Sequence, residues 1–366
     1  MLTIGVEEEY LLVSPATGVP VACAARVLAE AGLHPAVDRG EVQRELLQAQ
    51  LEVATPVCHG LDELGGHLLR LRHCLSGAAE ACGCRLAACG SAPFTDRLPV
   101  PVTPSARYRR MRRDAPALTD EQMINGMHVH IGVPGRAAGV AVLNGLRPWL
   151  PVLTALSANS PLWRGKDTGF ASWRTVVFGR WPVSGVPPHF ADDADYDRRI
   201  HRLVATGLLR DTGQLYWQAR LSERYPTVEV RATDVQLRAD EAVLLAGLVR
   251  ALAARSLDPR RAPAVPPAPP ELLQTAAWYA ARHGLAERLP DPATGTLVPA
   301  AEAAATTLAC VEPELRAGGD LERVGGGLRR LLAEGNGALR QRRELRQSGR
   351  KGLVRMITDE TAGILH

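Results

Sequence analysis

Apolar and polar residues alternate along several short segments of this chain, and a period of two is the pattern of a half-buried β-strand. The clearest segments lie at residues 2–13, 50–55, 126–133 and 227–233. Shorter runs at 85–91 and 214–220 predict further strands. Elsewhere, apolar residues recur at spacings of three and four, which predicts helices. The predicted helices occupy 20–32, 61–82, 136–158, 192–207 and 238–256.

Two long segments between these elements lack clear periodicity. Residues 93–122 are rich in Pro, Arg and Asp and predict a surface loop with a short helix, whereas residues 159–190 predict a long ordered loop. Loops of this length in a compact domain are commonly functional. Trp163, Trp173 and Trp181 in the second loop either cover a site or anchor the loop to the core.

A proline-rich run, PAVPPAPP at 263–270, predicts a stiff connector over 262–270. The segment 271–366 predicts a helical C-terminal layer, with helices at 271–283, 299–316, 320–334 and 336–347. Because their apolar stripes are narrow, we expect these helices to pack on the same body, so that residues 1–366 form a single domain. Strands and helices without strict alternation predict an α+β fold with a mostly antiparallel sheet and helices packed on one of its faces.

The composition narrows the class of protein. Of 366 residues, 46% are apolar and 22% are charged, which excludes disordered and collagen-like chains. A net charge of +4 and an aromatic content of 4% are too small for a nucleic-acid-binding surface. There is no secretory pattern and no apolar run of about 18 residues, so we expect no membrane association and a cytoplasmic location. The seven cysteines include no CxxC pair, which predicts reduced thiols rather than disulfides or a zinc site.

The candidate chemistry lies on the polar faces of the alternating strands. Residues two apart in a strand point to the same side, so each segment places ionisable residues opposite its apolar ones. The polar-face positions are Glu7 and Glu9, Gln50 and Glu52, His128 and His130, and Glu229 and Arg231. Glu45 lies on a turn or short helix that leads into the second of these strands. For any one strand alone, an exposed antiparallel face explains the pattern at least as well.

Taken together, the strands concentrate Glu and His where a solvated face would carry a broader mixture of residues. If the strands are neighbours, these carboxylates repel one another unless a cation lies between them. Carboxylates with an imidazole suit a hard divalent ion such as Mg²⁺ or Mn²⁺. Several such ions beside an arginine describe a phosphoryl-transfer site. The chain has no Walker loop and no GxGxxG motif between a strand and a helix, so a nucleotide would be held through metal.

Longer motifs extend this pattern over most of the chain. In order, from about residue 3 to 347, they are GVEEEYLLV, ELLQAQLEVATPVC, GMHVHIGVP, ANSPLWRGKDTGFASWR, FGRWPVSG, RYPTVEVRATDVQ, AARHGL and GNGALRQRR. Together they resemble the glutamate–cysteine ligase type 2 family. The resemblance implies a glutamine-synthetase-like catalytic fold, formed by a single catalytic domain with a metal-lined sheet face.

The resemblance also implies an ATP-dependent carboxylate–amine ligase. ATP would phosphorylate the side-chain carboxylate of glutamate, and an amine, such as that of cysteine, would displace phosphate to form a γ-glutamyl amide. The implied cofactors are ATP and Mg²⁺ or Mn²⁺, the partners are a small carboxylate and an amine, and the chain would form a homodimer. The implied metal ligands are Glu7, Glu9, Glu45, Glu52, His128 and Glu229.

The same match assigns roles to Arg231 and Arg164, and the other site residues are taken from their positions in the sequence. Arg231 corresponds to the arginine that contacts the transferred phosphoryl group, and Glu52 is counted with it as catalytic. Arg164 matches a substrate-carboxylate arginine, and His130, which has no counterpart in the family motifs, is assigned to the lining of the substrate site. Arg174, with Arg180, either binds substrate carboxylates through a bidentate fork or forms a surface ion pair.

Two other interpretations use the same cluster of Glu and His. One is a metal-dependent hydrolase of amide or phosphoester bonds, and the other is a non-catalytic family member that binds glutamate or a nucleotide. ADP release that requires both a carboxylate and an amine would separate a ligase from a hydrolase.

Overall fold

The computed structural model describes residues 2–38, 40–95, 99–261 and 268–364. Its main sheet has seven strands, all antiparallel, in the order β2-β3-β1-β5-β9-β8, with β4 paired to the last residues of β1. The strands are β1 Ile4–Val13, β2 Val42–Arg44, β3 Gln50–Ala54, β4 Arg85–Ala87, β5 Gly126–Gly132, β8 Ala219–Leu221 and β9 Thr227–Asp234. The predicted α+β class with an antiparallel sheet is therefore confirmed.

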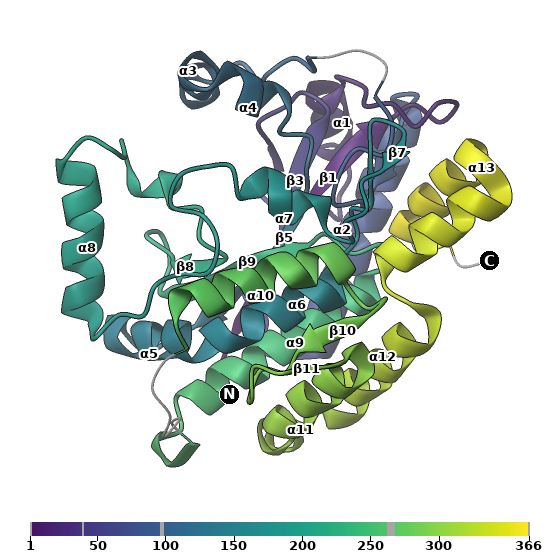
Figure 1. The fold of residues 1–366 in the computed structure, drawn as a ribbon. Coiled ribbons are helices and arrows are strands. Elements are labelled where there is room, and N and C mark those ends of the chain that lie inside the picture. Colours follow the sequence, from purple (N-terminus) through teal and green to yellow (C-terminus); the bar gives the residue numbers. More distant parts are fainter. Residues whose placement is uncertain (1, 39, 96–98, 262–267, 365–366) are drawn as a thin grey trace.

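Helices surround this sheet and form the rest of the body (Figure 1). Their bounds are α1 Ala24–Ala31, α2 Leu61–Ala81, α3 Ala106–Asp114, α4 Pro116–Asp120, α5 Arg136–Leu146, α6 Leu150–Ser157, α7 Trp173–Phe178, α8 Asp193–Ala205, α9 Ala239–Ser256, α10 Pro270–His283, α11 Ala300–Gly318, α12 Leu321–Glu334 and α13 Gly337–Ala362. Two small hairpins complete the structure, β6 Leu162–Trp163 with β7 Lys166–Asp167, and β10 Arg288–Pro290 with β11 Leu297–Pro299.

One face of the sheet is buried by helices. The apolar residues of its central strands, such as Val6, Val129 and Val230, share one core with side chains of α2, α5, α6 and α9. Burying one such side chain contributes about 1.5–3 kcal/mol. Because side chains alternate along a strand, this burial turns the ionisable residues of the same strands toward the opposite face.

Glu8 is the exception to the apolar pattern on the helix-covered face. It is fully buried and pairs with Arg72 of α2, whose Nε donates to a Glu8 oxygen at 2.9 Å. Arg72 also donates from Nη1 to the carbonyl oxygen of Leu237 at 2.8 Å. A buried ion pair with satisfied hydrogen bonds fixes the position of α2 against β1, since sliding the helix would leave a charge unpaired.

Several predicted elements differ from the observed ones. The strand predicted at 214–220 is a 3₁₀ turn at Thr212–Gln214 followed by the short β8, and β2 and the β10–β11 hairpin were not predicted. Strands of three residues are too short to show an alternating pattern. The last helix continues beyond 347 to Ala362, with a break at Gly349, where φ is 64°.

The stretch Arg136–Ser157 is long and apolar enough to cross a membrane by length and composition alone. It contains α5 and α6, which follow one another through a 3₁₀ turn at Arg147–Trp149. Of its most apolar window, 78% is buried inside the protein. The packing of α5 and α6 against α9 and α10 accounts for their apolar composition.

The C-terminal helices pack on the rest of the body. Helix α10 contacts α6, α11 and α12 contact α9, and α13 contacts β4 and α2 (Figure 1). Residues 262–267 of the predicted connector lie outside the described residues. The C-terminal segment contains the helices α10 to α13 and also the β10–β11 hairpin.

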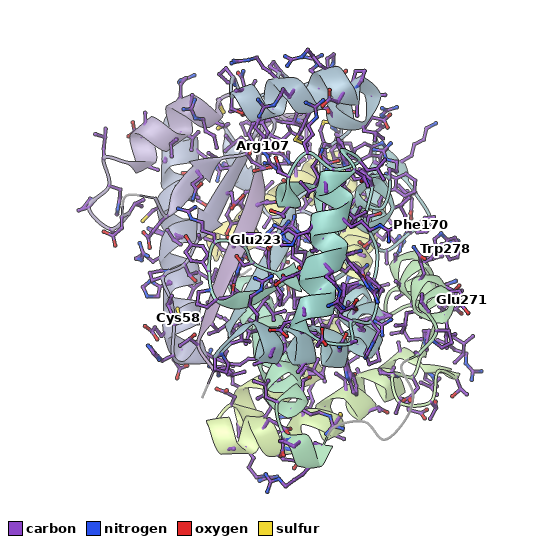
Figure 2. The ribbon with its side chains drawn as sticks, turned by 90° about the vertical axis from the view of Figure 1, so that its left-hand side faces the viewer. Cys58, Arg107, Phe170, Glu223, Glu271 and Trp278 are labelled. Atoms are coloured by element: carbon purple, nitrogen blue, oxygen red, sulfur yellow. The ribbon has the colours of Figure 1, made fainter. Side chains whose placement is uncertain are left out.

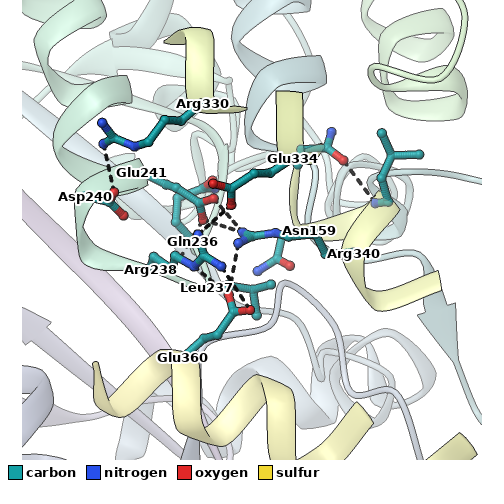
Figure 3. Close-up of polar contacts among 12 residues, drawn as sticks. Asn159, Gln236, Leu237, Arg238, Asp240, Glu241, Arg330, Glu334, Arg340 and Glu360 are labelled. Atoms are coloured by element: carbon teal, nitrogen blue, oxygen red, sulfur yellow. Dashed lines mark hydrogen bonds and ion pairs between the residues drawn. The ribbon is translucent and has the colours of Figure 1, made fainter. Parts of the chain in front are cut away.

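A buried charge network joins α9 to α13 (Figure 3). Arg340 contacts Glu241 of α9 at 2.7 Å and Glu360 of α13 at 3.0 Å. Arg238 contacts the same Glu360 at 3.1 Å and the more exposed Glu334 at 2.7 Å. Glu360 therefore satisfies two guanidinium groups at once and connects both halves of α13 to the N-terminus of α9.

We expect Glu360→Gln to lower the free energy of unfolding by about 1.5–3 kcal/mol, the usual cost of losing hydrogen bonds to a charged group. Glu334→Gln removes an exposed partner of the same Arg238 and should cost less than about 1 kcal/mol. Urea unfolding followed by circular dichroism measures both. Equal losses in the two variants would show that burial of the network does not increase its contribution to the free energy of unfolding.

Candidate active site

The strand register brings the predicted acidic and histidine residues together on the open face of the sheet. Directly opposite residues in antiparallel strands point to the same side. The opposed pairs are Glu9 with Glu52, Glu7 with His128, and His130 with Glu229. The condition set in the sequence analysis, that these strands are neighbours, is therefore met.

Glu7, His128 and Glu229 form the tightest group. One ligand atom from each lies within 4.8 Å of the others. Nδ1 of His128 is 3.1 Å from a Glu7 oxygen and 3.7 Å from a Glu229 oxygen. Nε2 of His128 is buried without a hydrogen-bond partner among the described residues, and it lies 3.9 Å from a Glu9 oxygen. A buried nitrogen that has no hydrogen-bond partner and lies beside carboxylates is suited to binding a metal ion.

Glu9, Glu45 and Glu52 form a second acidic group beside the first. Burial, and then the charges of Glu45, Glu7 and Glu9, raise the pKa of Glu52 well above its usual value. Burial also raises the pKa of Glu9 and of Glu45. These carboxylates resist ionisation together because burial outweighs the opposing charges of Arg174 near Glu9 and of Arg231 near Glu45 and Glu52. A divalent ion between them would favour their charged forms.

The negative charge of Glu229, in contrast, is compensated by two arginines. Nε of Arg220, on β8, donates to a Glu229 oxygen at 2.7 Å, and the Arg231 guanidinium contacts the other oxygen. Burial opposes ionisation of Glu229, but the charges of Arg231 and Arg220 hold its pKa well below the usual value. Glu229 is therefore ionised and available as a ligand, and Arg231 projects over the acidic face as its strand position predicts.

The donor set fits a hard divalent ion. It consists of carboxylate oxygens and one imidazole, without a thiolate, which matches Mg²⁺ or Mn²⁺ better than zinc. Of the predicted ligands, Glu7, His128 and Glu229 already have the spacing of a shared ion site, and Glu9, Glu45 and Glu52 lie in the same cavity. All of them line one cavity.

The cavity has a volume of about 1020 Å³ and opens beside the sheet. Its rim includes side chains that the sequence did not single out as site residues: Arg107 and Tyr108 of α3, Phe178 of α7, Tyr216, Arg220 and Arg224. Figure 2 looks onto the side where α8 stands and shows Arg107 together with Glu223 of the β8–β9 turn. Rim residues from loops and a short helix carry no periodic signal. The local sign in this region is the run RYRRM at 107–111, now part of α3, in which an aromatic residue lies among arginines.

The predicted substrate-binding residues lie in different places in the structure. His130 lines the cavity, with Nδ1 3.0 Å from Oγ1 of Thr227. Arg174 also lines it, is only 2% exposed, and donates from both terminal nitrogens to the carbonyl oxygen of Arg231 at 3.2 Å. Arg174 is therefore not a surface residue.

Arg164 is not brought to the cavity. It lies at the turn of the β6–β7 hairpin with φ at 52°, is exposed, and pairs with Glu121 at 2.7 Å. Arg180 contacts the same Glu121 at 2.5 Å, which agrees with the ion-pair interpretation. Of the three tryptophans in this loop, Trp181 lines the cavity, and its Nε1 donates to Gln122 at 2.8 Å.

A second group of possible ligands, Cys58, Glu63 and His67, lies at the start of α2, and Figure 2 labels Cys58. Each of these groups already has a partner. The Cys58 thiol donates to the carbonyl oxygen of Pro56, Glu63 accepts from the amide of His59, and a His67 nitrogen lies 3.1 Å from Arg70. These hydrogen bonds account for the positions of the three side chains without a bound ion. The cysteines are free thiols, as predicted.

Comparison with known proteins gives long matches. The family model described as glutamate–cysteine ligase family 2 matches residues 3–360. A provisionally named glutamate–cysteine ligase 2-1 from Saccharopolyspora erythraea is 43% identical, over 99% of this chain and 97% of its own. A provisionally named glutamate–cysteine ligase 2-2 from Mycolicibacterium vanbaalenii is 44% identical, over 94% of each chain.

Two solved structures share the fold. A glutamate–cysteine ligase from Francisella tularensis in complex with AMP has a TM-score of 0.74 and 14% identity, over 99% of this chain and 88% of its own. A bifunctional glutathione synthetase from Pasteurella multocida has a TM-score of 0.71 and 15% identity. The match covers 99% of this chain but only 52% of that larger protein.

Proposed function

The chain belongs to glutamate–cysteine ligase family 2, and from this membership we propose that it joins the side-chain carboxylate of glutamate to an amine through an acyl phosphate. The coarser activity, an ATP-dependent carboxylate–amine ligase, follows from the family itself. The observation that supports the finer proposal is the acidic sheet face with Arg231 above it. An array of carboxylates next to a guanidinium group suits a transferred phosphoryl group held by divalent ions.

The proposed reaction has two displacement steps. An oxygen of the glutamate side chain attacks the γ-phosphorus of ATP, and ADP leaves. The amine nitrogen then attacks the acyl carbon, loses a proton, and phosphate leaves. When bound, divalent ions supply positive charge that neutralises the phosphate oxygens.

The residues of the chain have separate tasks in this scheme. Glu7, His128 and Glu229, with Glu9 and the neighbouring carboxylates, hold the ions on the rigid sheet. Arg231 supplies a fixed donor to the oxygens of the group in transfer. Side chains of α7 and of the segment before β8 cover part of the cavity and exclude water from the acyl phosphate.

Arg174 is the best candidate for a substrate carboxylate. Its guanidinium is buried and lines the cavity, and the charges of Asp234 and Glu9 act on it without an ion pair within 4 Å among the described residues. Phe178 covers one face of this guanidinium at 5.2 Å. Since buried charges are normally paired, a bound anion would complete the environment of Arg174.

The test is ADP release from the purified chain with glutamate, a panel of amines including cysteine, and Mg²⁺. We expect ADP only when both the acid and the amine are present. ATP-independent loss of an amide or phosphoester substrate would support a hydrolase instead, and binding without turnover would support a non-catalytic member. The predicted homodimer and cytoplasmic location remain predictions.

The acyl-phosphate route predicts where oxygen goes. With oxygen-18 in both side-chain oxygens of glutamate, we expect one labelled oxygen in each phosphate released, because the carboxylate oxygen that attacks phosphorus leaves with it. Mass spectrometry of the phosphate measures this transfer. Unlabelled phosphate, or AMP with pyrophosphate as products, would contradict the route.

A further inference from the structure

Glu45 differs from the other acidic residues of the site in how the chain holds it. Glu7, Glu9, Glu52 and Glu229 lie on strands, where the ladder fixes the direction of each side chain. Glu45 lies just past the end of β2, in the turn before β3. A carboxylate on a turn needs another restraint to stay in place for an ion, and such restraints come from outer hydrogen bonds.

That restraint is supplied by the segment 103–108, which is far from Glu45 in the sequence. Oγ1 of Thr103 donates to the carbonyl oxygen of Glu45 at 2.5 Å, and the Thr103 amide donates to the carbonyl oxygen of Leu46 at 2.8 Å. The hydroxyl of Tyr108 donates to a carboxylate oxygen of Glu45 at 3.1 Å. This segment thus contacts both the backbone and the carboxylate of Glu45, and the carboxylate also interacts with the Leu46 amide and with Glu52.

Tyr108 is itself well anchored. Its amide donates to Oγ of Ser105, the N-cap of α3, at 3.1 Å. Its half-buried ring packs against the apolar cluster that contains Leu46 and Leu47, which directly follow Glu45 in the turn. The phenolic O–H of a tyrosine is a hydrogen-bond donor that a carboxylate can accept.

We propose that Tyr108 is a positioning residue for the divalent ions of this site. Its hydroxyl occupies one lone pair of the Glu45 carboxylate and turns the other oxygen toward the acidic face. The inference rests on the proposed function in one respect, that ions occupy this face. Tyr108 does not touch the reacting atoms in this scheme, so its effect reaches catalysis only through Glu45.

The direct test measures Mn²⁺ binding to the whole chain without ATP or amino acids, from the electron paramagnetic resonance signal of free Mn²⁺. Outer-shell partners of metal ligands typically contribute about 10–100-fold to affinity, so Tyr108→Phe should raise the Kd for Mn²⁺ by that factor. Tyr279→Phe, the same change on α10 beside His283 and away from the cavity, is the matched control and should leave the Kd unchanged.

A double-mutant cycle shows whether the hydroxyl acts through Glu45. In a Glu45→Gln background, Tyr108→Phe should change the Kd by less than about twofold, because the shared partner is already lost. In activity assays, Tyr108→Phe should raise the Mg²⁺ concentration for half-maximal rate, while kcat at saturating Mg²⁺ returns close to the wild-type value. A merely structural loss would lower kcat at every Mg²⁺ concentration.

Two results would overturn the inference. One is an unchanged Kd for Mn²⁺ in a Tyr108→Phe variant with a wild-type melting temperature. The other is an equal loss of affinity in the Glu45→Gln background, since the hydroxyl would then act elsewhere. Absence of Mn²⁺ binding to the wild-type chain would instead count against the metal site of the proposed function, so the two failures can be told apart.

Discussion

Glu229→Gln is expected to lower kcat about a thousandfold or more. Glu229 is 3% exposed and belongs to the tightest group of possible ligands, with Glu7 and His128. Glutamine keeps the size of the side chain but removes the negative charge that attracts a divalent ion. A metal ion in phosphoryl transfer contributes several kcal/mol to transition-state stabilisation, and about 4 kcal/mol corresponds to a thousandfold in rate.

The measurement is kcat by ADP release, together with the Kd for Mn²⁺ and the melting temperature. Excess EDTA should reduce the wild-type rate to the level of the variant. Glu223→Gln is the matched control, because Glu223 is an exposed residue of the same β8–β9 hairpin and should behave as wild type. A folded Glu229→Gln enzyme with normal kcat and normal Mn²⁺ affinity would remove Glu229 from the ligand set.

Loss of the carboxylate also leaves Arg220 and Arg231 without their shared partner, so Glu229→Gln can lose stability as well. Glu7→Gln separates the two effects. Glu7 belongs to the same group of ligands, but its side chain is more exposed and its contacts in the group are with histidines. We expect Glu7→Gln to lose Mn²⁺ affinity and kcat with little change in melting temperature.

The sequence could predict the residues of the sheet face because strand alternation is a local property. Glu7 and Glu9 point to one side whichever strand lies next to them, and the same holds for His128 and His130. The family motifs then placed Glu45, which alternation alone could not assign. What the sequence could not provide was the exact pairing, in which β1 and β5 are the centre of the site.

Residues that depend on long-range contacts were not predicted. Tyr108 and its partner Glu45 are 63 positions apart, and Arg72 and Glu8 are 64 positions apart. Such pairs form only when the fold brings two elements together, and the sequence around either partner contains no pattern that predicts the other. The charge of Glu8 on the buried face even contradicts the alternation, and Arg72 compensates for it.

In the loop 159–190, the family motif assigned a role to a residue that the structure does not place at the site. The motif match assigned a substrate contact to Arg164, but the hairpin turn carries this side chain to the surface beside Glu121. Arg174, ten positions later, lies in the first turn of α7 and is buried instead. In a segment without periodicity, the sequence cannot say which of two arginines faces inward.

Arg231→Lys is expected to lower kcat by about a hundredfold to a thousandfold, the usual loss when one fixed donor to a developing charge is removed. Lysine keeps the charge but lacks the planar fork of the guanidinium group. Arg231 contacts Glu229 and lies 5.6 Å over the Phe178 ring, and its Nε has no hydrogen-bond partner among the described residues. A guanidinium group that is held in place and has an N–H without an acceptor can donate to an oxygen of the transferred phosphoryl group.

The observed ion pair leaves a structural role as the competing interpretation, because Arg231 could serve only to compensate Glu229. Arg220→Lys distinguishes the two, since Arg220 compensates the same carboxylate from the neighbouring strand. If compensation is all that matters, both variants should lose melting temperature and keep kcat. If Arg231 acts on the transferred group, only Arg231→Lys should lose kcat strongly, with a small change in the KM for ATP. Near-normal kcat in a folded Arg231→Lys enzyme would exclude Arg231 from catalysis.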